Sequence, residues 1–108
     1  MHIPQTEIIL RHDGAELARV TLPPGEYVIG RSAEVEIHAE TPLLSRRHAK
    51  LTLEHDQLFI QDLGSSNGTF INGEPVTQIT QLLPNQEIRL DLTSRWRSTV
   101  NARPVNLI

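Results

Sequence analysis

Apolar and polar residues alternate along most of this chain, with a period of two. The clearest stretches are residues 18–22, 48–53, 87–92 and 95–103. Such alternation is typical of β-strands with one face buried, and no stretch longer than a turn has the 3.6-residue period of a helix. About ten short strands, separated by turn signals every 8 to 12 residues or so, predict an all-β sandwich or barrel.

Turn-forming residues divide these strands. Asp13-Gly14 joins residues 6–10 and 15–22 into a first hairpin, and Pro23-Pro24-Gly25 ends it because proline cannot donate to a ladder. Further strands are expected at residues 27–29, 35–37, 57–62, 79–83 and 87–92. Asn72-Gly73 predicts a type I′ turn, Pro75 predicts an edge strand, and Pro104 is expected to end the last strand.

Composition limits the kind of protein this can be. At 108 residues the chain has room for one domain, which we expect to span residues 1–108 with a core of about 6–103. Ten Lys and Arg against thirteen Asp and Glu give a formal charge of −3, so no overall basic field favours nucleic acid. Four of the basic residues nevertheless lie between Arg31 and Lys50, which suits a small anionic ligand.

Several other classes are unlikely on sequence grounds. The chain has no cysteine, which excludes disulfides, thiol nucleophiles and thiolate zinc sites. It has no long apolar run, so we expect no membrane insertion and a cytoplasmic protein. The same sequence is also compatible with a module of a longer chain. We expect no metal and no cofactor, and the oligomeric state stays open.

Polar residues gather where the expected strands end. Gly30-Arg31 follows one strand, Ser45-Arg46-Arg47-His48 opens another, and a small-polar loop leads through Ser66-Asn67-Gly68 towards Asn72-Gly73. Loops held by a rigid sheet are common places for binding. Turn formation alone is the alternative for the Ser, Asn and Gly residues, since they favour turns for local reasons.

In order and spacing these motifs resemble those of forkhead-associated domains. The resemblance spans roughly residues 8–92 and includes Gly30-Arg31, Ser45-x-x-His48 and Ser66-Asn67-Gly68. It implies a β-sandwich of two mainly antiparallel sheets with ten to eleven strands. It also implies a module that binds a threonine-phosphorylated protein or peptide, either in another molecule or in a tail of a longer parent chain.

The resemblance assigns roles to individual residues. A phosphate ester needs a charged fork and neutral donors, and Arg31 can supply the fork. Its alternative is a surface ion pair with Glu34 or Glu36. The resemblance implies that Ser45 and Arg46 also contact the phosphate, that Ser66 contacts the phosphate or its neighbours, and that Asn67 holds the peptide backbone. Gly30, Gly68 and His48 are expected to support the site, and selectivity is expected to depend on residues 32–44, 64–66 and 91–94.

Two other functions remain open. Ser45 or Ser66, His48 and Asp62 supply the residue types of a hydrolase triad, although no G-x-S-x-G elbow is present. The five histidines lack metal-ligand spacing. The main alternative is a module of the same fold that docks proteins independently of phosphate.

Overall fold

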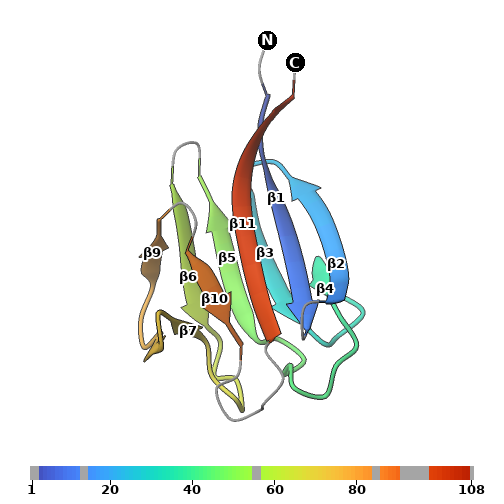
Figure 1. Ribbon diagram of the computed structural model, residues 1–108, viewed down its shortest axis with the longest axis vertical. Helices are drawn as coiled ribbons and strands as arrows, with labels where there is room; N and C mark the ends of the chain where they lie inside the picture. The colour runs from blue at the N-terminus through green and yellow to red at the C-terminus, as the bar shows by residue number, and fades with distance from the viewer. Residues whose placement is uncertain (1–2, 13–14, 55–56, 84–85, 91–97, 108) are drawn as a thin grey trace.

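The chain folds into two β-sheets packed face to face (Figure 1). The computed structural model describes residues 3–12, 15–54, 57–83, 86–90 and 98–107. Their strands are β1 (Ile3–His12), β2 (Ala15–Leu22), β3 (Gly25–Gly30), β4 (Ile37–His38), β5 (Ala49–Leu53), β6 (Leu58–Asp62), β7 (Phe70–Ile71), β8 (Glu74–Pro75), β9 (Thr80–Leu82), β10 (Glu87–Arg89) and β11 (Ser98–Leu107). The predicted β-sandwich is therefore confirmed.

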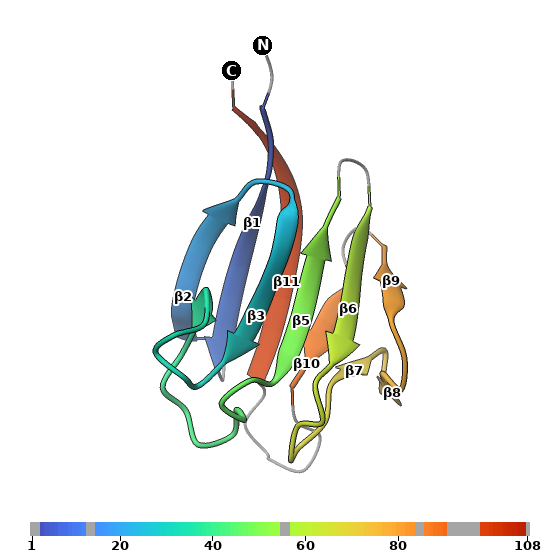
Figure 2. The ribbon, with the colours of Figure 1, turned by 180° about the vertical axis from the view of Figure 1, so that it is seen from behind.

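One sheet has six strands in the order β2-β1-β11-β10-β7-β8, and the other has five in the order β4-β3-β5-β6-β9. All pairings are antiparallel except β3 with β4, which run parallel. The two layers are seen from opposite sides in Figures 1 and 2. The arrangement agrees with the expected mainly antiparallel sandwich.

The core lies between the sheets and follows the alternation of the sequence. In β5, Ala49, Leu51 and Leu53 are buried while Lys50 and Thr52 are partly exposed. The opposing sheet contributes Ile8 and Leu10 from β1 and Ile88 from β10, together with Leu90, which follows β10. Burying each such side chain contributes about 1.5–3 kcal/mol. The period-two pattern thus determines which strand faces meet.

The turns observed agree with those expected from the sequence at most positions. The β7–β8 hairpin turns through Asn72 and Gly73, with φ of 53° and 81°, and both positive values are what a type I′ turn requires. Pro75 lies in β8, an edge strand, as predicted. The β1–β2 hairpin is present with a register shift between Leu10 and Arg11, and its turn at Asp13-Gly14 lies outside the described residues.

Two strand predictions need correction. The strand expected at residues 35–37 begins only at Ile37, because a turn occupies residues 32–35: the Val35 N–H donates to the Ser32 carbonyl and the Glu34 N–H donates to Ser32 Oγ. Only Ile37–His38 pairs with β3. Pro104 does not end the last strand either, since β11 continues to Leu107. Pro104 pairs with Thr6 of β1, and among the described residues no strand pairs with β11 on its other side beyond Asn101, where a residue without an N–H is tolerated.

The strand ends bring the polar motifs to one end of the molecule. β3 ends at Gly30, β5 begins at Ala49 and β6 ends at Asp62, all at the end of the sandwich opposite the chain termini (Figures 1 and 2). Among the residues that the structure describes, no helix has the length and apolar character to cross a membrane. Of the loops expected to determine selectivity, residues 91–94 lie outside the described part.

Candidate functional site

The candidate site is built where the β3–β5 ladder runs on into the loops. The His48 N–H donates to the Ile29 carbonyl (2.8 Å), the Arg31 N–H to the Ser45 carbonyl (3.0 Å) and the Ser32 N–H to the Arg46 carbonyl (3.2 Å). These backbone bonds extend the contact between the two segments beyond the regular strands. They hold Arg31 beside Ser45, although the two residues are distant in sequence.

Gly30 allows this close approach. A Cβ atom at this position would collide with the backbone carbonyl of Arg46, and a backbone group cannot move aside as a flexible side chain can. The pairing of Arg31 with the Ser45 segment therefore depends on glycine at position 30. This contact supports the expected role of Gly30 in holding the site together.

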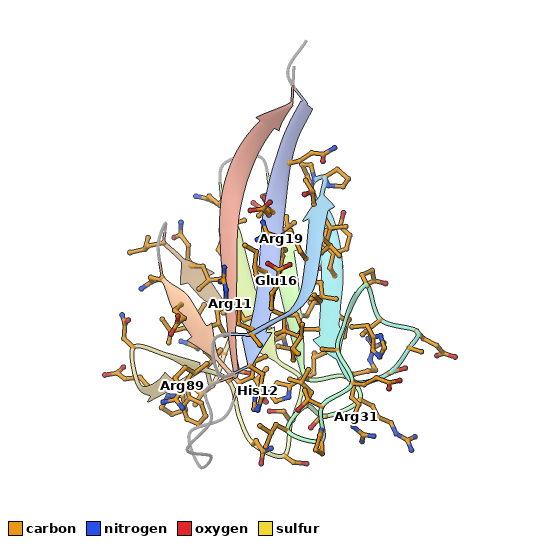
Figure 3. All side chains as sticks on the ribbon, turned by 45° about the vertical axis from the view of Figure 1, so that its right-hand side comes forward. Arg11, His12, Glu16, Arg19, Arg31 and Arg89 are labelled. Atoms are coloured by element: carbon orange, nitrogen blue, oxygen red, sulfur yellow. The ribbon has the colours of Figure 1, made fainter. Side chains whose placement is uncertain are left out.

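Arg31 is exposed at the loop end of the sandwich, where its side chain projects outward (Figure 3). Its Nε donates to the Leu44 carbonyl at 3.1 Å, which fixes the stem and leaves both Nη groups to face a ligand. None of the ion pairs found within the described residues includes Arg31, and Glu36 instead accepts from the Val28 N–H. Pairing with Glu34 or Glu36 is therefore not observed.

His48 is fully buried and connects two of the loops. Its Nδ1 accepts from the Ser45 N–H at 3.1 Å, and its Nε2 lies 2.7 Å from the Gly68 carbonyl. The first contact needs a lone pair on Nδ1 and the second needs a hydrogen on Nε2, so the neutral Nε2–H tautomer satisfies both. The ring thus braces the Ser45 and Gly68 segments against each other.

Two further hydrogen bonds join these loops at the surface. Ser45 Oγ accepts from the Ser66 N–H at 2.9 Å, which leaves the hydroxyl hydrogen of Ser45 to be donated elsewhere. Asn67 Nδ2 donates to the Leu43 carbonyl at 2.8 Å. Asn67 therefore ties two loops of its own chain, a role that the sequence did not indicate. Gly68 adopts a φ of 87°, which agrees with its expected turn.

Asp62 is the main residue that sequence reasoning missed as part of the site framework. Its carboxylate accepts from the Gly64 and Ser65 N–H groups and from the Ser65 and Thr69 hydroxyls. Burial by itself raises the pKa of Asp62, but these four hydrogen bonds outweigh it and leave the pKa below its ordinary value. The signal was an Asp followed closely by Gly and Ser, which is typical of an Asx turn.

Three arginine side chains are exposed at this end of the sandwich. Arg31, Arg46 and Arg47 are all exposed, whereas Lys50 is paired with Glu26 at 3.3 Å. Three exposed guanidinium groups on adjoining loops favour an anionic ligand despite the net negative charge of the chain. The structure brings all five predicted ligand-binding residues, which are Arg31, Ser45, Arg46, Ser66 and Asn67, onto the adjoining loops.

The hydrogen bonds of His48 and Asp62 differ from those of a hydrolase triad. In a Ser–His–Asp triad the base accepts from the nucleophile hydroxyl and donates to the acid. His48 instead accepts from the backbone N–H of Ser45 and contacts the carbonyl of Gly68. The Asp62 carboxylate is bound by its own loop. Across the described ranges, no group of three or more His, Cys, Asp or Glu residues is arranged to hold a metal.

Comparison with known proteins agrees with this geometry. The family model described as FHA domain matches residues 27–91. The FHA domain-containing protein FhaB of Mycobacterium tuberculosis is 30% identical over 77 residues, which cover 71% of this chain and 50% of FhaB. The glycogen accumulation regulator GarA of the same organism is 43% identical over 47 residues, covering 44% of this chain and 29% of GarA. The chain thus spans about half the length of FhaB, and its match to GarA is shorter.

Solved structures share the fold over nearly the whole chain. The FHA domain of CT664 from Chlamydia trachomatis superposes with a TM-score of 0.77 at 23% identity, covering 91% of this chain and 95% of the other. The FhaA FHA domain complexed with the intracellular domain of Rv3910 has a TM-score of 0.73 at 28% identity, covering 91% and 99%. A third structure comes from a structural and functional analysis of phosphothreonine-dependent FHA domain interactions. It has a TM-score of 0.74 at 28% identity and covers 92% of this chain and 95% of the other.

Proposed function

Because this chain belongs to the forkhead-associated (FHA) domain family, we propose that it is a phosphothreonine-dependent protein-interaction module. Arg31, Ser45, Arg46, Ser66 and Asn67, on the loops at one end of the sandwich, bind a threonine-phosphorylated segment. Its partner is a phosphorylated protein or a phosphorylated tail of a longer parent chain. The domain acts by binding in signalling or regulated assembly, and it is not an enzyme.

One observation carries this proposal: an exposed guanidinium and a hydroxyl lie on neighbouring, interlocked loops. Arg31 is held beside Ser45 by backbone pairing, and its Nε bond to Leu44 orients the rest of the fork outward. Ser45 Oγ accepts from Ser66 and keeps a hydrogen to donate. A phosphate with close to two negative charges and three acceptor oxygens matches a charged fork beside a neutral donor.

Two of the solved relatives support this proposal, one for the phosphothreonine dependence and the other for a protein partner. One comes from work on phosphothreonine-dependent FHA domain interactions, and another contains an FHA domain bound to the intracellular domain of a partner protein. Both are 28% identical to this chain over more than nine-tenths of its length. The cytoplasmic location expected from the sequence stays a prediction.

We expect the site to distinguish phosphothreonine from phosphoserine. One buried methyl group contributes about 0.8 kcal/mol by transfer, and more when it restricts the side-chain rotamer. The phosphoserine form of a peptide should therefore bind several-fold more weakly. Inorganic phosphate should bind far more weakly than either, because it lacks the peptide backbone that Asn67 and the loops contact.

Isothermal titration calorimetry tests this function. A binding sequence is first selected from a degenerate phosphothreonine peptide library, and it is then titrated in phosphothreonine, phosphoserine and unphosphorylated threonine forms. We expect affinity in the order phosphothreonine, phosphoserine, unphosphorylated. Equal binding of the phosphorylated and unphosphorylated forms would instead favour a phosphate-independent docking module of the same fold.

A further inference from the structure

We infer that Asp62 is a positioning residue for the phosphopeptide site, because its carboxylate fixes the conformation of residues 64–69 and so presents Ser66 and Asn67 to the peptide. The inference rests on the proposed function and assigns a role to a residue that does not itself contact the ligand. It also predicts a change of binding opposite in sign to the one that electrostatics alone would produce.

The Asp62 carboxylate closes the loop from both of its ends. Asp62 is the last residue of β6, and its Oδ2 accepts from the N–H groups of Gly64 (2.9 Å) and Ser65 (3.0 Å). Its Oδ1 accepts from the hydroxyls of Ser65 (2.5 Å) and Thr69 (2.7 Å). One side chain therefore binds the start of the loop and the residue that follows its tip.

Further hydrogen bonds within the loop restrain Ser66 and Asn67, the residues proposed to face the ligand. Ser65 Oγ accepts from the Gly68 N–H at 2.9 Å, so the hydroxyl held by Asp62 also sets the far side of the turn. Between Ser65 and Gly68 lie Ser66 and Asn67, the two predicted ligand residues of this loop. Thr69 is buried, and its carbonyl accepts from the Val76 N–H at 2.8 Å, which anchors the loop to the sheet beyond it.

A carboxylate suits this position because four donors converge on it. Two oxygens with about four lone-pair sites can accept all of them, whereas an amide offers a single oxygen and an alanine offers none. The same negative charge lies at the end of the domain that is proposed to bind a dianion. If Asp62 acted through its charge alone, removing it would strengthen phosphopeptide binding. If it positions the loop, removing it weakens binding.

Two substitutions test this inference from different directions. Asp62→Ala removes the acceptor, and Thr69→Val removes one donor while keeping both the negative charge and the side-chain volume. We expect the phosphothreonine peptide to bind about tenfold more weakly to Asp62→Ala and about fivefold more weakly to Thr69→Val, as the loss of hydrogen bonds to a charged group implies. Thr69→Ser, which retains the hydroxyl, should recover most of the affinity lost in Thr69→Val.

Glu74→Gln is the control for charge. Glu74 is exposed in β8, outside the loops proposed to bind the peptide, so this variant removes one carboxylate without touching the Asp62 loop. Its affinity should stay the same or increase slightly. Unchanged or tighter binding by a folded Asp62→Ala variant would overturn the inference.

Two further readouts separate positioning from a general loss of stability. In a double-mutant cycle, the effect of Asp62→Ala should shrink in an Asn67→Ala background but persist in an Arg31→Ala background, because only Asn67 lies on the loop that Asp62 holds. Amide exchange without peptide should accelerate at Gly64, Ser65, Ser66 and Gly68 but not at Leu51 or Ile60. Equal effects in both backgrounds, or uniform acceleration, would contradict the inference.

The wild-type protein separates failure of the inference from failure of the proposed function. If wild type prefers the phosphorylated peptide and the Asp62 and Thr69 variants bind as it does, the function stands and the positioning role is wrong. If wild type shows no preference for phosphate, the proposed function is wrong and the inference falls with it.

Discussion

Arg31 and His48 lie at the same end of the sandwich but in different environments. Arg31 is exposed and uses only Nε to hold itself in place, at the Leu44 carbonyl. His48 is fully buried and has both ring nitrogens within hydrogen-bond distance of backbone atoms. The first arrangement leaves positive charge exposed to a ligand, whereas in the second the ring joins two loops.

The exposed position of Arg31 leads to a prediction for binding. Arg31→Ala should weaken phosphopeptide binding by about 2 to 4 kcal/mol, because it removes a charge-assisted bidentate contact and leaves the phosphate unpaired. The melting temperature should change little. Calorimetric titration gives the affinity, and thermal denaturation gives the stability.

Arg47→Ala is the appropriate control for this measurement. It removes the same charge from an exposed neighbouring position that is not among the predicted ligand residues. A loss for Arg47→Ala as large as that for Arg31→Ala would mean that both act only through the local positive field. Unchanged affinity for Arg31→Ala would exclude Arg31 as the phosphate ligand.

At the scale of elements, the site is a continuation of the β3–β5 pairing. The ladder passes from Ile29 and Ala49 through His48 to Arg31 and Ser45, so the strands determine where the loops begin. The β6–β7 loop joins this frame through His48 and Ser45. We therefore expect His48, just before β5, to affect mainly stability, and the residues at the tip of the β6–β7 loop to affect mainly binding.

This division predicts different outcomes for two neighbouring substitutions. His48→Ala should lower both the melting temperature and the affinity, because it leaves a cavity and unsatisfied groups at Ser45 and Gly68. Ser45→Ala should weaken binding by about 1 kcal/mol or more with little effect on unfolding, since the Ser66 N–H that it releases is near solvent. Denaturation and titration of the same two variants provide the test.

For each variant, the loss of stability relative to the loss of binding affinity shows whether the residue supports the loops or contacts the ligand. A His48→Ala variant that kept its melting temperature and yet lost all binding would assign His48 a direct ligand role. His48→Gln serves as an intermediate, because its amide can still form one of the two backbone contacts. Its stability should fall between those of wild type and His48→Ala.

For the whole molecule, unfolding depends on pH through carboxylates whose pKa is shifted by folding. Burial raises the pKa of Asp62, but its hydrogen bonds lower it more, and the net pKa in the folded state lies below the ordinary value of 3.8. A carboxyl with a depressed folded-state pKa stabilises the fold above its unfolded pKa. That stability is lost as the pH falls through the folded-state value.

Acid unfolding measured by circular dichroism tests this linkage. Asp62→Asn should destabilise the protein most near neutral pH, and progressively less as the pH falls from the unfolded pKa of about 3.9 through the lower folded-state pKa, where Asp62 of wild type becomes protonated. Glu16→Gln is the comparison, since the pKa of Glu16 is also lowered, chiefly by its hydrogen bond to Arg19, but both side chains are exposed. Solvent screens that pair, so its pH-dependent effect should be smaller. A pH-independent penalty for Asp62→Asn would contradict the prediction.

Local sequence predicted much of the fold, and each of the two errors has an identifiable structural cause. Alternation correctly predicted the buried face of β5, and Asn72-Gly73 predicted its turn, because each depends on residues adjacent in the chain. The strand expected at residues 35–37 begins only at Ile37, because hydrogen bonds to Ser32 stabilise a turn over residues 32–35. The prediction for Pro104 was wrong because β11 continues past it by pairing with β1, and no described strand needs its N–H on the other side.

The sequence by itself determined the strand pattern, the turn chemistry and the family resemblance, since all of these lie in residue type and short spacing. Only the tertiary structure decided which loops meet. Asn67 contacts the Leu43 carbonyl 24 residues away, and His48 contacts Gly68 across 20 residues. Such contacts depend on the order in which strands pair within a sheet. Backbone groups can therefore become partners of Asp62, His48 and Asn67 in ways that no local pattern records.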